Sequence, residues 1–202
     1  PIVTTTSDSE EKPLVSDVGL AAFDEARAAF YQGDYPKALA QAEKALASLP
    51  SDTTLHEFRG LVQFALKKYK DSAASIYAVL SVAPGWDWTT MSELYPSVDV
   101  YTQQLRDLEA FTQKNPMAPE GHFLLAYHYM TTGSTEAAAT QLQETVSLSP
   151  NDQVARQLLQ LVKGPDAQPA EKPAPSKQPD DAKAPASVVG NWKAASSGGG
   201  SV

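Results

Sequence analysis

The sequence contains no cysteine among its 202 residues, so disulfides, a thiol nucleophile and cysteine-ligated zinc are excluded. It also lacks long hydrophobic runs: no apolar stretch approaches the roughly 18–20 residues that a membrane-spanning helix needs. The sequence therefore predicts no membrane span.

Basic side chains are too few to balance the acidic ones, and the formal net charge is −8. Residues 1–162 carry 11 Lys and Arg against 20 Asp and Glu, whereas residues 163–202 carry five Lys against four acids. An acidic domain repels a phosphate backbone, so we expect no nucleic-acid partner.

The chain begins with Pro1 rather than Met, which suggests a processed piece of a longer protein. A cysteine-free chain with a Thr/Ser-rich start and a Pro/Ala-rich spacer favours an exported bacterial protein of the periplasm or cell surface. The cytoplasm stays open as the alternative.

A repeat near 34 residues runs through the chain. Three series keep intervals of 34, 32 and 34 residues: Pro50, Pro84, Pro116 and Pro150; Ala26, Gly60, Ser92 and Ala126; and Ala42, Ile76, Leu108 and Leu142. Such self-similarity is typical of stacked helical hairpins, each of which needs a neighbour to bury its apolar face. The predicted fold class is therefore all-α, with about four hairpins and a capping helix.

The composition divides the chain into segments. The predicted layout is a flexible arm over 1–16; a repeat domain over 17–162, with repeats at about 19–50, 53–84, 85–116 and 119–150 and a capping helix at 152–162; a Pro/Ala-rich linker over 163–187; and a tail or the stub of a following β domain over 188–202. Both end segments are predicted to be disordered, because they hold too few apolar residues to offset the ordering entropy.

The third repeat departs from the others. It has lost two residues between Pro84 and Ser92, and its first helix, from about Asp87 to Leu94, is cut short at Tyr95-Pro96. The residue before a proline disfavours the helical region. Aromatic side chains beside a backbone break resemble binding hot spots, so Trp86 and Trp88 are candidates, with ordinary packing as the alternative.

The repeats resemble tetratricopeptide repeats, whose pattern is W-x2-L-G-x2-Y, then A-x3-F-x2-A, then Pro. The matching residues are Gly33-Asp34-Tyr35 with Ala38, Ala42 and Ala45; His56, Arg59 and Gly60; Trp88, Met91, Ser92 and Tyr95; and His122, Leu125, Ala126 and Tyr129 with Ala138 and Leu142. The resemblance covers about residues 19–162 and implies a right-handed superhelix that binds peptides or proteins.

In this family the first helix of each repeat lines a concave groove. The matching candidates here are Phe23, Arg27, Phe30, Glu57, Leu61, Phe64, Thr89, Glu93, Phe123, Tyr127 and Met130. Some members grip a C-terminal carboxylate with Lys, Arg and Asn at these positions. This chain offers one Arg, two Glu and no Asn there, so the resemblance does not extend to that clamp.

A shorter resemblance lies at Gly190-Asn191-Trp192, because a Gly-x-Trp begins the first strand of lipocalin-like barrels. It implies that a longer parent would carry such a domain after the linker.

No residue pattern predicts catalysis. His56 and His122 stand 32 and 34 residues either side of Trp88, so all three fill one repeated slot kept for a bulky packing residue. Adjacent carboxylates such as Asp24 and Glu25 diverge on a helix, and general acid–base work needs them to converge. We therefore expect no enzyme, no metal site and no cofactor.

Two functions follow from the repeats. The first is a protein-interaction module that holds a peptide or partner segment in the groove, with acidic residues favouring a basic ligand. The alternative is an architectural or assembly element that oligomerises, or that spaces a C-terminal barrel from another surface. The sequence leaves the oligomeric state open.

Overall fold

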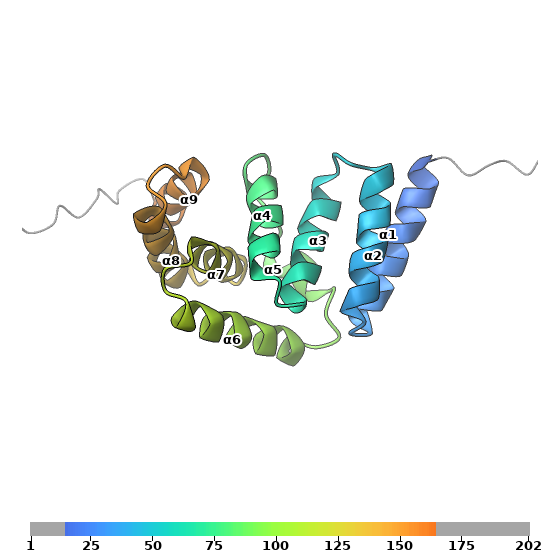
Figure 1. Cartoon of the computed structure of the whole chain (residues 1–202), viewed down its shortest axis with the longest axis horizontal. Helices are drawn as coiled ribbons and strands as arrows, with labels where there is room; N and C mark the ends of the chain where they lie inside the picture. The colour runs from blue at the N-terminus through green and yellow to red at the C-terminus, as the bar shows by residue number, and fades with distance from the viewer. Residues whose placement is uncertain (1–14, 165–202) are drawn as a thin grey trace, which may run out of the picture. The chain divides into compact units, whose positions relative to one another are not determined.

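The computed structural model describes residues 15–164 (Figure 1). Its elements are α1 (Val15–Tyr31), α2 (Tyr35–Ser48), α3 (Thr53–Ala65), α4 (Tyr69–Leu80), α5 (Trp88–Ser92), α6 (Val98–Lys114), α7 (Pro119–Thr131), α8 (Thr135–Leu148) and α9 (Gln153–Lys163). All are helices, which confirms the all-α prediction. The predicted linker and the Gly190-Asn191-Trp192 stub lie outside the described residues, as does nearly all of the N-terminal arm.

Aspartates begin four of the helices. Asp34, Asp52, Asp87 and Asp152 each accept a hydrogen bond from the backbone N–H three residues later, at distances of 2.8 to 3.2 Å. A side-chain oxygen at this position satisfies an amide that has no partner within the helix. None of the helices in residues 15–164 is long and apolar enough to cross a membrane.

Three pairs of consecutive helices pack as hairpins, namely α1 with α2, α3 with α4, and α7 with α8, and α9 then packs on α8. Small residues let the helices approach closely. A Cβ at Gly60 would lie 2.7 Å from Ile76 Cδ1, and the Gly60 carbonyl accepts a hydrogen bond from Ser72 Oγ at 2.7 Å. The period of small residues in the sequence therefore reflects the contact between paired helices.

The third repeat is not a hairpin. α5 has only five residues, too few to form a hairpin with α6, and α4 packs directly on α7. Figure 1 shows α6 lying below α3, α4 and α7, across the lower ends of α3 and α4. Two features explain the difference: Tyr95-Pro96, and the shortened turn at residues 84–87, which we call the Trp86 turn or the clipped turn. They leave too few residues for a full first helix.

α6 is held by contacts to five other helices, one of which is α5, whose Trp88 packs on Tyr101. Tyr101 packs its ring against Phe64 of α3 and His128 of α7, and Gln104 Nε2 donates to Tyr35 Oη of α2 at 2.9 Å. At the start of α4, Tyr69 packs against Phe111, with ring centroids 4.8 Å apart. The helix thus crosses the repeats instead of stacking with them.

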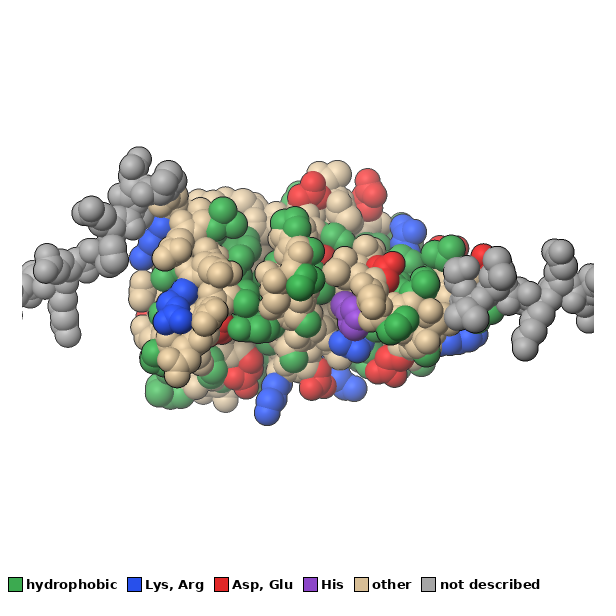
Figure 2. Space-filling view, turned by 90° about the horizontal axis from the view of Figure 1, so that it is seen from above, with side chains coloured by type: hydrophobic (Ala, Val, Ile, Leu, Met, Phe, Trp, Pro, Cys, Tyr) green, Lys and Arg blue, Asp and Glu red, His purple; other side chains and the backbone are tan. Residues whose placement is uncertain are grey.

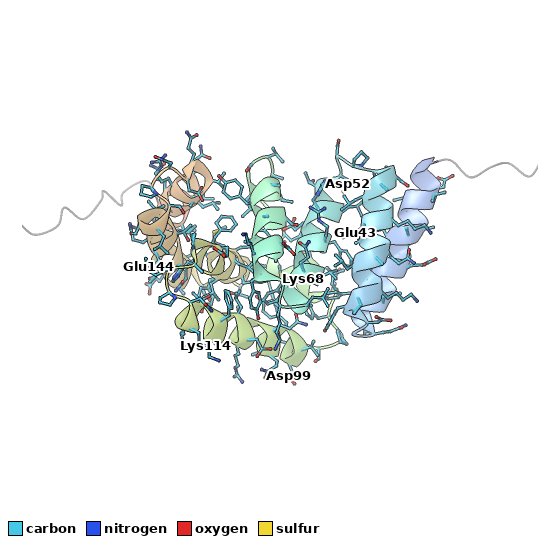
Figure 3. The ribbon with its side chains drawn as sticks, viewed as in Figure 1. Glu43, Asp52, Lys68, Asp99, Lys114 and Glu144 are labelled. Atoms are coloured by element: carbon cyan, nitrogen blue, oxygen red, sulfur yellow. The ribbon has the colours of Figure 1, made fainter. Side chains whose placement is uncertain are left out.

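The ends of α6 carry charges that suit the helix dipole. Asp99 lies in the first turn and Lys114 in the last, and both are labelled in Figure 3. Negative charge is favourable at a helix N-terminus and positive charge at a C-terminus. Lys67, just before α4, pairs with Asp107 in the middle of α6 at 2.8 Å.

Candidate functional site

The structure divides the candidate groove and hot-spot residues into three groups. Phe30, Glu57, Leu61, Phe64, Phe123 and Tyr127 are buried; Phe23, Trp86, Trp88 and Met130 are half-buried; and Arg27, Thr89 and Glu93 are exposed. The buried group contributes to the core in this conformation. The half-buried and exposed groups present most of the surface of the set that a partner can reach.

A pocket of about 270 Å³ brings candidates from two repeats together, and we call it the Trp86 pocket. It is lined by Pro84, Gly85, Trp86, Asp87, Tyr127, Met130 and Thr131. Trp86 comes from the clipped turn, whereas Tyr127 and Met130 come from α7. The short third repeat thus places the turn against the fourth repeat.

A buried carboxylate holds this turn in place. Glu57 of α3 is only 3% exposed, and its Oε1 accepts hydrogen bonds from the Trp86 backbone N–H at 2.6 Å and from Tyr127 Oη at 2.7 Å. Burial raises the pKa of the Glu57 carboxyl, and the two hydrogen bonds oppose that rise. The Glu57 carboxylate therefore joins α3, the turn and α7.

Glycine is required in the same turn. Gly85 adopts φ +78°, and a Cβ there would lie 2.9 Å from Leu80 Cδ2 and 3.2 Å from Glu57 Oε1. Residues with a side chain rarely adopt this backbone conformation. The turn can approach Glu57 only because position 85 has no side chain.

The charged residue at the rim of the Trp86 pocket is Asp87. Its carboxylate accepts the Thr90 N–H at 2.8 Å, and this hydrogen bond lowers the pKa of the exposed carboxyl. Asp87 therefore stays ionised beside the aromatic wall.

Trp88, the other hot-spot candidate, lies elsewhere. Its ring packs on Tyr101 of α6 with centroids 4.9 Å apart, and it does not line the Trp86 pocket. Arg27 lies over the Phe23 ring at 5.9 Å on α1. The candidates in residues 15–164 are thus dispersed, but Trp86, Tyr127 and Met130 share a pocket.

His56 and His122 occupy equivalent positions in their repeats and have the same structural role, which Arg156 shares. His56 Nε2 lies 2.7 Å from the Pro50 carbonyl oxygen, His122 Nε2 lies 3.0 Å from that of Pro116, and Arg156 Nη1 donates to that of Pro150 at 2.7 Å. Each side chain satisfies the carbonyl of the proline six residues earlier. In the clipped third repeat the interval is only four, and Trp88 packs on α6 instead.

Sequence reasoning did not single out Thr131, which lines the pocket and donates to the Tyr127 carbonyl at 3.0 Å. No feature of the repeat pattern marks this threonine. Within residues 15–164, no three His, Asp or Glu side chains gather where a metal ion could bind.

Figure 2 shows one face of the molecule from above, where hydrophobic side chains appear in separate groups among polar ones.

Comparison with known proteins gives one family. A model of the tetratricopeptide repeat matches residues 23–85 and 105–153. The unmatched stretch between them, residues 86–104, contains Trp86, α5 and the beginning of α6. It is the same region in which the helices depart from a regular hairpin.

No curated protein matches the chain. Among solved structures, the chain is similar to the first tetratricopeptide repeat domain of Spaghetti (RPAP3), bound to the HSP90 peptide SRMEEVD. The sequence identity is 16%, the match covers 73% of this chain and 92% of that chain, and the TM-score is 0.33.

Proposed function

This chain belongs to the tetratricopeptide repeat family, and we propose that it is a non-enzymatic protein-interaction module that binds a peptide or partner segment at the Trp86 pocket. The observation that carries the proposal is the convergence of Trp86 with Tyr127 and Met130. The resemblance to the repeat family predicts Tyr127 and Met130, and the shortened third repeat predicts Trp86. All three line the same pocket.

The physical properties of the pocket suit a partner side chain. Trp86 and Met130 are half-buried, so each presents apolar surface without being exposed as a free patch. Tryptophan is enriched among residues that dominate binding energy, and methionine adapts to differently shaped partners. The ionised Asp87 at the rim favours a partner with a basic residue next to its apolar anchor.

The remaining candidates define a wider surface for the same partner. Exposed Arg27, Thr89 and Glu93 would contact parts of the partner that extend beyond the pocket. Phe23, which is half-buried in the first repeat, would add an apolar contact. The buried candidates, such as Phe64, would act by shaping the surface. We therefore expect the largest losses of affinity at the pocket and smaller ones at the exposed candidates.

The test uses a phage-displayed library of random 12-residue peptides selected on the full chain. Affinities of the selected peptides are then measured by fluorescence anisotropy for wild type, Trp86→Ala and Met130→Ala. Met117→Ala is the matched control, because Met117 is 77% exposed and does not line the Trp86 pocket. A circular dichroism melt confirms that each variant is folded.

We expect Trp86→Ala to weaken binding about tenfold or more, Met130→Ala to weaken it less, and Met117→Ala to leave it unchanged. Peptides that bind wild type and Trp86→Ala equally would show that the Trp86 pocket is not the binding site. A library that yields no binding peptide would count against the interaction function itself.

A further inference from the structure

A second pocket lies where α4 faces the beginning of α7 and the end of α8, and we call it the Tyr77–Phe123 pocket. Its volume is about 250 Å³, and its apolar wall includes Ala74, Tyr77 and Phe123. The rings of Tyr77 and Phe123 lie 5.5 Å apart between centroids. Small-molecule sites usually occupy about 300–1,000 Å³, so this pocket has the size for one large side chain.

The displaced third repeat explains why the pocket exists. In a regular array the first helix of the third repeat would stand beside α4, but α5 has five residues and α4 meets α7 instead. Two walls of the pocket, α4 and α8, are second helices of their repeats. Its third wall is α7, a first helix that supplies the groove candidate Phe123, so the pocket extends from the groove onto second helices and shares no lining residue with the Trp86 pocket.

The charges at the rim are unequal. Lys70 lies on the α4 side, while Glu120, in the first turn of α7, and Asp152, at the start of α9, lie on the other. In the part of the chain that the structure describes, none of these three forms an ion pair. The same part, residues 15–164, holds 11 Lys and Arg against 17 Asp and Glu, so the surrounding field is also negative.

We propose that the Tyr77–Phe123 pocket docks a basic amphipathic segment of a partner protein. The segment packs one apolar side chain against the wall that Ala74, Tyr77 and Phe123 form, and places a Lys or Arg beside Glu120 and Asp152. Charge complementarity of this kind steers association and selects among partners that carry the same apolar anchor. This inference does not depend on the Trp86 pocket, because the two pockets share no lining residue.

The test selects peptides on the full chain carrying Trp86→Ala, which removes the tryptophan from the other pocket. The probe is again a phage-displayed library of random 12-residue peptides. Binding of the selected peptides is measured for three further changes in that background: Glu120→Lys, Ala74→Trp and Glu136→Lys. Ala74 is exposed on α4, so a tryptophan there fills the pocket without disturbing the core.

Glu136→Lys is the matched control, because Glu136 lies in the first turn of α8, as Glu120 does in α7, but lines neither the Tyr77–Phe123 pocket nor the Trp86 pocket. We expect the selected peptides to pair an apolar residue with Lys or Arg. Their affinity should fall at least tenfold with Glu120→Lys and with Ala74→Trp, and should be unchanged with Glu136→Lys. Changing the peptide's Lys to Glu should restore binding to Glu120→Lys.

Three results would each overturn the inference: selected peptides without enriched Lys or Arg, equal binding to the Glu120→Lys and Glu136→Lys variants, or a library that yields no binder on the Trp86→Ala chain. The Trp86 pocket is judged separately, on peptides selected with the wild-type chain.

Discussion

Lowering the pH should destabilise this domain through one buried histidine. His128 is 1% exposed, its ring packs on Phe64 with centroids 4.0 Å apart, and burial lowers its pKa to about 3. Its Nδ1 lies 3.3 Å from Tyr101 Oη, and its Nε2 has no partner in the described structure. A proton on this ring would place an uncompensated charge in the core.

The magnitude follows from the difference in proton uptake between the two states. In the unfolded chain the histidine takes up a proton near pH 6.5, whereas in the folded domain it stays neutral down to about pH 3. The unfolded state therefore binds more protons, and stability falls as the pH drops below 6.5. The loss is about 1.4 kcal/mol per pH unit, or about 2 kcal/mol between pH 7 and pH 5.

Urea denaturation at pH 7 and pH 5 measures this loss, with His128→Phe as the variant that cannot titrate. The variant removes a partner of Tyr101, but that cost is present at both pH values and cancels in the difference. His56→Gln is the control, because His56 is not buried in the core. We expect wild type to lose about 2 kcal/mol more than His128→Phe over this interval. Equal losses, or an NMR titration of His128 near pH 6.5, would refute the reasoning.

Three further changes test the packing around the Trp86 turn and α6. Glu57→Ala should lower the free energy of unfolding by about 2 kcal/mol or more in a thermal melt, because Tyr127 Oη loses its buried acceptor. Gly85→Ala should destabilise by about 1–3 kcal/mol in the same assay, since φ +78° and the 2.9 Å approach both oppose a Cβ. Asp107→Asn should change the urea midpoint little, by under about 1 kcal/mol, because its partner Lys67 is 63% exposed; larger losses would show that the pair is coupled to the core.

Local sequence signals predict the regular repeats well. The small residues at the 34-residue period, such as Gly60, mark the close contact of paired helices, and Asp34 and Asp152 lie where a capping side chain is needed. These features depend on residues within one helical hairpin, three residues apart for the caps and 16 for the contact of Gly60 with Ile76. They can therefore be read from spacing and residue type.

Contacts between distant segments could not be predicted in this way. The sequence indicates that the third repeat is short, but not that α4 would pack on α7 or that α6 would cross the repeats. Glu57 meets Trp86 and Tyr127 across 29 and 70 residues, and no periodic pattern marks such a pair. The candidate groove residues fit the repeat pattern, yet their exposure depends on how the third repeat is displaced.

The crossing helix changes how the domain should unfold. In a regular repeat array each repeat contacts only its neighbours, so stability is close to a sum of local terms. Here Gln104 of α6 bonds Tyr35 of the first repeat, and Glu57 of the second bonds Tyr127 of the fourth. We therefore expect Leu108→Ala in α6, which removes a fully buried side chain at a cost of about 2–5 kcal/mol, to reduce amide-exchange protection in α2 and α7 alike. Loss of protection confined to residues 98–148 would mean that the first two repeats unfold independently and that α6 does not couple them.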